Sequence, residues 1–270
     1  MHNGPVRIAL IDSGLGLLST AAALRRARPD ADLVLSMDPD HMPWGPRTPA
    51  DVAERALAGA RAALPYRPDA LVVACNTASV HALDRLRAEF EPGVPVIGTV
   101  PAVKPAAATG GPVAVWATPA TTGSAYQREL IERFAAGVPV AAVACPGLAE
   151  AVESADSERI DAAVADAAGR SPADTAVVVL GCTHYDLVQD RIVSAFARPV
   201  ALMTAAGAVA AQTLRRLGAR PEPDAAPTGA LTVLASGRAA GFPERAAGYP
   251  AACALTTAQP LSRSAARPSH

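Results

Sequence analysis

The alternation of short apolar runs with amphipathic stretches is the feature that most limits how this 270-residue chain can fold. The apolar runs are rich in Val, Ile and Leu and are bounded by Gly, Pro, Asp or Ser, which is typical of buried strands. We expect strands at residues 6–11, 32–36, 70–74, 95–97, 112–116, 139–143, 175–180, 199–203 and 231–235. The stretches between them carry apolar residues three and four apart, which predicts helices. We expect these helices at residues 16–28, 49–64, 77–89, 121–135, 147–154, 157–168, 185–196 and 205–217. The alternation predicts an α/β fold with mainly parallel sheets.

Two segments of the chain resemble each other and suggest two related lobes. Residues 69–77 read DALVVACNT, and residues 174–184 read DTAVVVLGCTH. Both run from Asp through an apolar strand to Cys and then to hydroxyl or amide side chains. We therefore predict two α/β lobes. The first is expected at residues 1–100 plus 210–258 and the second at residues 101–209. The stretch 259–270 is expected to be a disordered tail, because it is rich in Ser, Arg, Ala and Pro.

The composition argues against several classes of protein. The formal net charge is −1 and no basic block stands out, so we expect no nucleic-acid partner. The four cysteines are far apart and form no CxxC pair, which argues against a zinc site. Lys104 is the only lysine, and it has no cofactor-binding signature beside it, so pyridoxal-phosphate chemistry is disfavoured. We expect neither a metal nor a cofactor.

The start of the chain and its hydropathy favour a cytoplasmic protein. Residues 1–5 run straight into the first predicted strand, so we expect no signal peptide. The chain has no run of about 20 apolar residues of the kind that spans a membrane. We expect a cytoplasmic location, where thiols stay reduced, and no membrane partner.

Cys75 and Cys182 occupy matched positions in the two related segments. Each follows a buried strand and precedes an expected helix N-terminus, whose free N–H groups favour a thiolate. Either cysteine alone reads as a small apolar core residue, but the pair with matched polar neighbours favours chemistry. Inversion of a stereocentre requires a base on one face and an acid on the other, and a thiol with a pKa of about 8.5 can serve as either. The pair therefore predicts a racemase that acts on the Cα–H bond of a small amino acid.

Polar residues at strand ends complete the predicted site, because ligands of parallel α/β sheets bind there. Asp12 could orient or deprotonate Cys75, or simply cap a helix. His184 could assist Cys182 or hold a substrate carboxylate. The groups that could bind the substrate carboxylate and its carbanion are Ser13, Asn76, Thr77 and Thr183. Ser236 and Gly237 lie at a fourth strand end.

Several motifs together resemble the glutamate racemase family, within the aspartate/glutamate racemase group. They occur in the family's order over about residues 8–240. The motifs are Ile11–Gly16 (IDSGLG), Pro43–Thr48 (PWGPRT), Ala74–Ser79 (ACNTAS), Leu180–Tyr185 (LGCTHY), the Thr-rich turn with Thr118, Thr121, Ser124 and Tyr126, and the stretch from Cys145-Pro146 to Val152-Glu153. The two cysteine motifs are highly specific together, whereas Asp-Ser-Gly alone is weak.

The resemblance implies two pseudo-symmetric lobes with the active site between them. It implies interconversion of L- and D-glutamate without a cofactor or metal, which supplies D-glutamate to peptidoglycan, and it is compatible with a homodimer. Carried over by position, Cys75 and Cys182 are the opposed acid and base, Asp12 is the partner of Cys75, and His184 and Glu153 lie on the Cys182 side. From its own surroundings, Glu153 reads equally well as an exposed helix residue. The substrate-binding residues implied are Asp12, Ser13, Pro43, Trp44, Gly45, Asn76, Thr77, Thr118, Thr183 and His184.

The chain departs from the family pattern at three positions, and other interpretations stay open. Trp44 stands where Tyr is usual, Leu17 replaces a common Gly and Asp186 replaces a common Pro. Trp44 bears on the choice of substrate, so a related racemase or isomerase acting on aspartate or another small acid is the main alternative. A thiol hydrolase or transferase with Cys182 as nucleophile and His184 as base would leave Cys75 unexplained. A noncatalytic binding protein would be expected to have lost one thiol.

Overall fold

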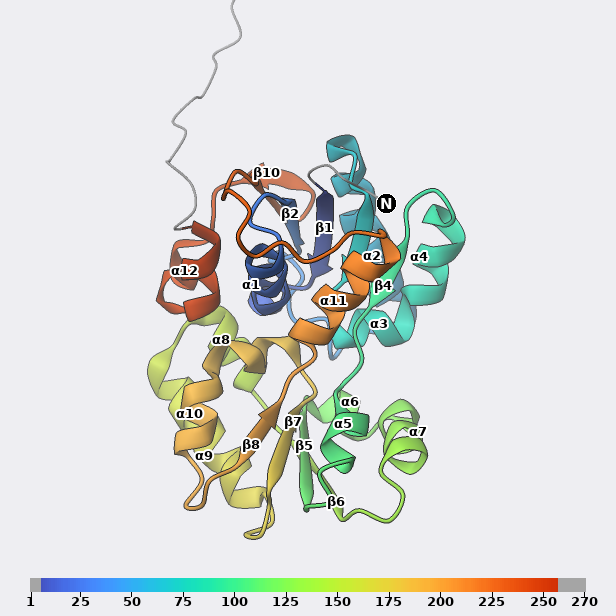
Figure 1. Cartoon of the computed structure of the whole chain (residues 1–270). Helices are drawn as coiled ribbons and strands as arrows, with labels where there is room; N and C mark the ends of the chain where they lie inside the picture. Colours follow the sequence, from blue (N-terminus) through green and yellow to red (C-terminus); the bar gives the residue numbers. More distant parts are fainter. Residues whose placement is uncertain (1–5, 257–270) are drawn as a thin grey trace, which may run out of the picture.

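The computed structural model describes residues 6–256, which form two parallel-stranded sheets stacked end to end with helices around them (Figure 1). The six-stranded sheet has the order β10-β9-β2-β1-β3-β4, and the four-stranded sheet has the order β6-β5-β7-β8. The first sheet contains β1 (Arg7–Asp12), β2 (Asp32–Met37), β3 (Ala70–Val73), β4 (Val96–Gly98), β9 (Leu231–Ala235) and β10 (Arg238–Ala240). The second contains β5 (Val113–Ala117), β6 (Val140–Ala144), β7 (Val177–Leu180) and β8 (Ala201–Met203). All these pairs are parallel except β9 with β10.

The two sheets repeat one strand order. In the first, β1 pairs with both β2 and β3, and β4 follows β3. In the second, β5 pairs with both β6 and β7, and β8 follows β7. The orders 2-1-3-4 and 6-5-7-8 are therefore equivalent, which confirms the predicted α/β fold with two pseudo-symmetric lobes. In each lobe the strand order reverses at the first strand, and ligands bind beyond such a reversal.

Helices cover both faces of each sheet because the buried strands are apolar on both sides. The α-helices are α1 (Leu18–Ala27), α2 (Pro49–Ala63), α3 (Asn76–His81), α4 (Leu83–Phe90), α5 (Val103–Ala107), α6 (Pro119–Thr122), α7 (Ala125–Phe134), α8 (Leu148–Ser154), α9 (Ser157–Arg170), α10 (Gln189–Ser194), α11 (Ala206–Arg216) and α12 (Pro250–Thr256). Short 3-10 helices are η1 (Leu15–Leu17), η2 (Leu64–Tyr66), η3 (Thr183–Val188) and η4 (Glu244–Gly248). No helix in the described part of the chain is long and apolar enough to cross a membrane.

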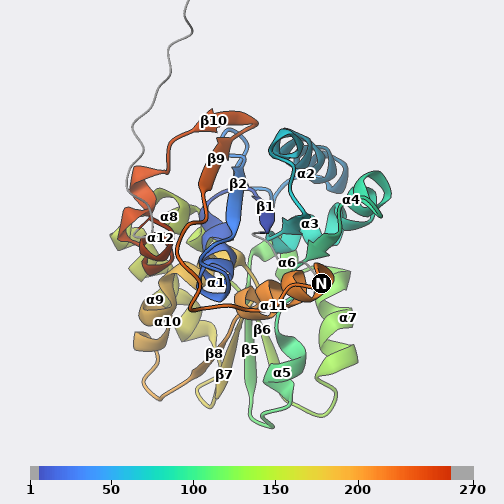
Figure 2. The same ribbon diagram turned by 45° about the horizontal axis from the view of Figure 1, so that its top comes forward.

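Alternate residues of the central strand β1 supply two separate cores. Ile8 and Leu10 face a core that also contains residues of α1, α11 and α12, whereas Ala9 and Ile11 face a core with α2, α3 and α4. Figure 2 shows α1 and α2 on opposite sides of the strands. The first of these cores continues into the second sheet through Trp116. The two lobes thus share buried apolar contacts, which fix the strand ends of one lobe against those of the other.

The structure differs from the predicted elements at several places. The helix expected at 77–89 is interrupted at Ala82, and the helix expected at 121–135 is divided because Ser124 caps a new helix by accepting from Gln127 N–H. The stretch expected at 185–196 begins as a 3-10 helix. The sequence reading missed β10, α5, η4 and α12. The expected tail, 259–270, lies outside the described residues, and the lobe boundaries near 100 and 209 stay a prediction.

Candidate active site

The carboxyl ends of the central strands enclose one small cavity between the lobes. Its volume is about 30 Å³, which is room for one or two water molecules. Most of the predicted site residues line it, including both Cys75 and Cys182. The lining comprises Ser13, Met42, Pro43, Trp44, Gly45, Cys75, Asn76, Thr77, Thr118, Thr121, Ala149, Gly181, Cys182, Thr183 and His184. The two thiols reach this cavity from equivalent positions, because β3 and β7 are the equivalent strands of the two sheets.

Cys75 is a buried thiol at the N-cap of α3. Burial raises the pKa of this thiol well above its usual value, and the nearby Asp12 raises it further. Backbone N–H groups of Ala78 and Thr77 favour the thiolate but do not outweigh these effects. The helix N-terminus therefore acts on Cys75 in the expected direction, but burial and Asp12 outweigh it and favour the thiol. The sequence pattern indicates where the helix begins, but not the loss of water around the sulfur.

Asp12 lies at the end of β1 and is fully buried. Its Oδ1 accepts from Ser13 N–H over 2.6 Å, and its Oδ2 accepts from the Thr183 hydroxyl over 3.0 Å. Burial raises the pKa of Asp12, although the charge of His184 and the hydrogen bonds from Thr183 and Ser13 oppose that rise. Asp12 influences Cys75 through its charge, while its hydrogen bonds go to Ser13 and Thr183. Its role as the partner of Cys75 stays a prediction.

Cys182, His184 and Glu153 form a chain of contacts on the opposite side of the cavity. Cys182 Sγ lies 3.9 Å from His184 Nδ1, and His184 Nε2 lies 3.0 Å from Glu153 Oε2. His184 is buried, and burial lowers the pKa of its imidazole. Cys182, Glu153 and Asp12 outweigh burial and raise the pKa well above its usual value. The arrangement can therefore supply an imidazolium next to the Cys182 sulfur.

Glu153 is buried on α8, at 8% exposure, so the alternative of an exposed helix residue is wrong. Burial raises the pKa of its carboxyl, but bonds from His184, Leu15 N–H and Arg245 outweigh burial and hold the pKa below its usual value. Leu15 N–H donates to Oε2 over 2.7 Å. Glu153 is thus a buried carboxylate with charged partners, which is the state that such a group needs in order to stay ionised.

Two glycines of the first motif allow these groups to approach each other. A Cβ on Gly16 would lie 2.3 Å from Thr183 Oγ1 and 2.8 Å from His184 Nδ1. A Cβ on Gly14 would lie 2.2 Å from Glu153 Oε2. Glycine is required at both positions because the η1 backbone packs directly against the polar groups of the other lobe.

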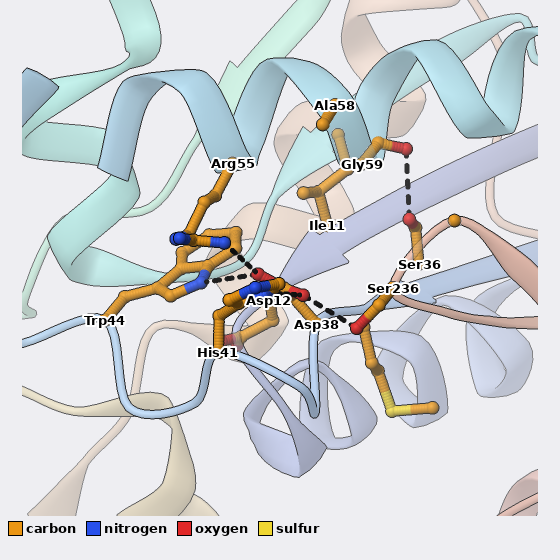
Figure 3. Close-up of a pocket in the computed structure, with 12 residues that line it drawn as sticks. Ile11, Asp12, Ser36, Asp38, His41, Trp44, Arg55, Ala58, Gly59 and Ser236 are labelled. Atoms are coloured by element: carbon orange, nitrogen blue, oxygen red, sulfur yellow. Dashed lines mark hydrogen bonds and ion pairs between the residues drawn. The ribbon is translucent and has the colours of Figure 1, made fainter. Parts of the chain in front are cut away.

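Trp44 is buried and separates the thiol cavity from a second cavity of about 130 Å³, since it lines both. Its Nε1–H donates to Asp38 Oδ2 over 3.1 Å. Figure 3 shows the indole nitrogen and the Arg55 side chain directed toward Asp38, with Ser236 on its other side. The polar edge of the indole is therefore held by Asp38. Ser236 and Gly237, at the fourth strand end, line this second cavity and not the thiol cavity.

The remaining predicted residues bring hydrogen-bonding groups to the thiol cavity. Asn76 donates from Nδ2 to Gly181 O over 3.0 Å, while its buried Oδ1 accepts no hydrogen bond from the described residues. Thr118 caps α6, and its hydroxyl donates to Thr121 Oγ1 over 3.1 Å. Unpaired acceptors are rare in protein interiors, so Asn76 Oδ1 is suited to receive a donor from a ligand.

Sequence reasoning missed several residues around the site. Met42, Ala149 and Gly181 line the thiol cavity; Met42 lies next to a quoted motif and the other two lie inside one, so their positions gave a usable signal. Arg245 and Asp38 contact Glu153 and Trp44, and neither belongs to a motif. The other cysteines lie elsewhere: burial raises the pKa of Cys145 to about 12, and Cys253 is exposed. Within residues 6–256 no group of three or more His, Cys, Asp or Glu side chains is placed to hold a metal ion.

Comparisons with known proteins point to one family. The family model described as Asp/Glu/Hydantoin racemase matches residues 15–211. The glutamate racemase of Herpetosiphon aurantiacus is 38% identical over 219 residues, which cover 78% of this chain and 85% of the relative. That of Sphingopyxis alaskensis is 39% identical over 214 residues, or 75% of this chain and 79% of the relative. The structure of Escherichia coli glutamate racemase in complex with L-glutamate and the activator UDP-MurNAc-ala aligns with a TM-score of 0.74 and 30% identity, covering 81% of this chain and 85% of that one.

Proposed function

The chain belongs to the Asp/Glu/Hydantoin racemase family, and we propose that it is an isomerase that interconverts L- and D-glutamate without a metal or cofactor. The observation that carries this proposal is the placement of Cys75 and Cys182 on one cavity from equivalent strand ends of two lobes. A proton can then leave one face of Cα and arrive at the other. The similarity to glutamate racemases supports glutamate as the substrate.

The proposed reaction moves one proton at each thiol. A thiolate at Cys182 takes the Cα proton, and the electron pair left on Cα is delocalised into the substrate carboxylate. Cys75 then gives its thiol proton to the opposite face of Cα, which yields the other enantiomer, a thiol at Cys182 and a thiolate at Cys75. The reverse direction uses the same steps with the thiols exchanged.

The charges around each thiol fit this assignment of starting states. Burial and the Asp12 carboxylate raise the pKa of Cys75, so it is a protonated acid when the site holds no substrate. Cys182 lies beside His184, whose pKa is raised, so an imidazolium can stabilise its thiolate. A substrate ammonium near Asp12 would offset the carboxylate charge and let Cys75 serve as the base for the other enantiomer.

The proposed substrate contacts follow from the hydrogen-bonding groups that line the thiol cavity. Asn76 Oδ1 is an acceptor suited to the ammonium group. Ser13, Thr77, Thr118 and Thr183 supply hydroxyls for the carboxylates, with nearby backbone N–H groups. Pro43, Trp44 and Gly45 form the wall beside them. Because a cavity of about 30 Å³ is smaller than glutamate, we propose that the lobes or the loop at 42–45 move apart to admit it.

The cellular role is proposed on the same basis. D-glutamate made by this reaction would supply peptidoglycan synthesis, in the cytoplasm, where the thiols stay reduced. A homodimer, and the lack of nucleic-acid and membrane partners, stay predictions from the sequence.

Proton exchange at Cα tests the proposed function. The purified protein is incubated in D₂O with L-glutamate and then with D-glutamate, without added metal or cofactor, and deuterium at Cα and optical rotation are followed by NMR and polarimetry. We expect exchange with loss of rotation in the wild type, and loss of racemisation in Cys75→Ser and Cys182→Ser. Cys145→Ser is the matched control, because this buried thiol does not line the cavity. If neither enantiomer of glutamate exchanges its Cα proton but aspartate does, the substrate is aspartate and not glutamate.

A further inference from the structure

Arg245 brings a positive charge from the C-terminal part of the chain to the Cys182 side of the site. It lies in η4, and its Nη2 donates to Glu153 Oε1 over 2.6 Å while its Nε donates to Glu153 O over 2.9 Å. The guanidinium therefore holds the side chain and the backbone of one residue at the same time. Such a planar fork fixes orientation as well as charge.

The two oxygens of the Glu153 carboxylate have different partners. Oε1 accepts from Arg245, whereas Oε2 faces His184 Nε2 and accepts from Leu15 N–H. By holding the oxygen that His184 does not contact, Arg245 opposes tilting of the carboxylate away from the imidazole. His184, held by Oε2 at one ring nitrogen, presents the other ring nitrogen to Cys182 Sγ.

We propose that Arg245 is a positioning residue for Cys182, acting through Glu153 and His184 to hold the imidazole against the sulfur. The part of this proposal that concerns turnover rests on the proposed function, since it takes Cys182 to be one of the two acid/base thiols. The part that concerns thiol reactivity does not. The family match covers residues 15–211, so Arg245 lies outside the part of the chain that matches the family.

The C-terminal segment also joins the two lobes at this point. Tyr249 donates its hydroxyl to Val152 O over 2.6 Å, so two consecutive residues of α8 are held by this segment. The following helix α12 packs against α1 of the first lobe, and Figure 1 shows it at the edge of the molecule, beside α1 and above α8. The segment that carries Arg245 therefore contacts α8 through η4 and Tyr249, and α1 of the first lobe through α12.

The ionisable groups around His184 determine how removal of Arg245 should affect the imidazole and the Cys182 thiol. They are Cys182 on its own element, Asp12 from β1, Glu153 from α8 and, through Glu153, Arg245 from η4. The packed element η1 supplies only the backbone N–H of Leu15. Without Arg245 the Glu153 carboxylate is held, among the described residues, only by Leu15 N–H and His184, so the imidazole is held less firmly against the sulfur and the neighbouring thiolate becomes harder to form.

The first measurement is the rate of alkylation of Cys182 by iodoacetamide against pH, followed by mass spectrometry. In Arg245→Gln we expect alkylation of Cys182 at neutral pH to slow by about threefold or more, while alkylation of exposed Cys253 on α12 keeps its wild-type rate. In turnover of glutamate we expect kcat to fall about tenfold and KM to change much less. Arg245→Lys should recover part of both effects, because it keeps the charge but loses the fork.

Two variants separate positioning from loss of structure. Tyr249→Phe removes the other contact between this segment and α8 but leaves Arg245 in place. Arg61→Gln removes a comparable arginine fork to Glu89 far from the site. In both variants the alkylation rate of Cys182 should depend on pH as it does in the wild type. An unchanged Cys182 profile in Arg245→Gln, or the same shift in Tyr249→Phe, would overturn the proposal. If the wild type does not racemise glutamate but the alkylation shift is found, the proposed function fails and the positioning role stands.

Discussion

The Thr183 hydroxyl donates to Asp12 Oδ2 over 3.0 Å and thereby joins the ends of strands that belong to different sheets. Thr183 directly follows Cys182, while Asp12 raises the pKa of Cys75. This bond therefore couples the surroundings of the two thiols, because a change in the charge or position of Asp12 affects both Cys75 and the residue that follows Cys182.

Asp12→Asn should lower the pKa of Cys75. The negative charge of Asp12 disfavours the Cys75 thiolate, and neutral Asn removes that effect while keeping an acceptor for Thr183. The thiolate should then form at lower pH, which alkylation of Cys75 against pH would detect. Asp38→Asn is the control, since Asp38 does not contribute to the shift at Cys75. An unchanged or higher midpoint in Asp12→Asn would contradict this account.

Glu153→Gln should reduce turnover strongly without unfolding the protein. Gln has the same shape but no charge, so His184 loses the partner that favours its imidazolium. We expect kcat to fall on the order of 100-fold, which is within the usual range for an acid/base contribution. Glu150→Gln on the same helix should have little effect. Comparable losses in both variants, measured by polarimetry, would argue for a general weakening of α8.

Gly16→Ala should abolish activity through a steric effect. The new methyl group would lie 2.3 Å from Thr183 Oγ1, so the hydroxyl and the neighbouring imidazole must move. Gly207→Ala provides the comparison, because a Cβ at that helical position meets nothing within 4 Å. It should leave kcat unchanged and raise stability by about 0.5–1 kcal/mol. Full activity in Gly16→Ala would show that η1 can shift without cost.

Trp44→Phe should reduce stability more than it alters substrate choice. The indole N–H bonds to Asp38, so its loss removes a hydrogen bond worth about 1 kcal/mol. The remaining ring still forms the wall of the thiol cavity. We expect a lower midpoint in urea denaturation and a ratio of glutamate to aspartate turnover within about threefold of the wild type. A reversal of that ratio would make the indole a determinant of specificity.

Asp186→Asn should stabilise the protein at neutral and alkaline pH. Burial raises the pKa of Asp186 from 3.8 to about 8, so the folded state binds this proton more tightly than the unfolded state. Stability from this group is therefore present at low pH and is lost as pH rises from about 4 through about 8. Thermal unfolding scans should show a gain in Tm for Asp186→Asn on the order of a few degrees at pH 8 and a smaller gain at pH 4. Asp190→Asn, on the neighbouring helix, serves as the control. An equal change at both pH values would exclude the carboxyl group as the cause.

Each predicted strand is present, and the central strands β3 and β7 gave a clear signal because a strand buried on both faces is apolar along its whole length. The edge strand β10 was not predicted because its three residues are exposed and have no apolar pattern. The short helix α12 was missed as well, since its two buried residues, Ala252 and Leu255, make a single pair at helical spacing.

The convergence of the site could be predicted because it depends on local sequence. Cys75 and Cys182 each follow a recognisable strand, and strand ends meet in parallel sheets. The contact between Arg245 and Glu153 could not be predicted, because it joins residues 92 positions apart and no periodicity encodes it. The raised pKa at Cys75 was also hidden, since it depends on how completely the cavity closes around the sulfur.

The repeated strand order gives the two thiols equivalent backbones, yet their neighbours differ, with Asp12 near Cys75 and His184 near Cys182. A racemase works on mirror-image substrates whose equilibrium constant is one, so thermodynamics requires equal kcat/KM in the two directions. Unequal thiol surroundings can therefore give one enantiomer a higher kcat only if its KM is higher by the same factor. The asymmetry of charge between the lobes should then be visible as a matched difference in KM for the two enantiomers, with no bias in the final mixture.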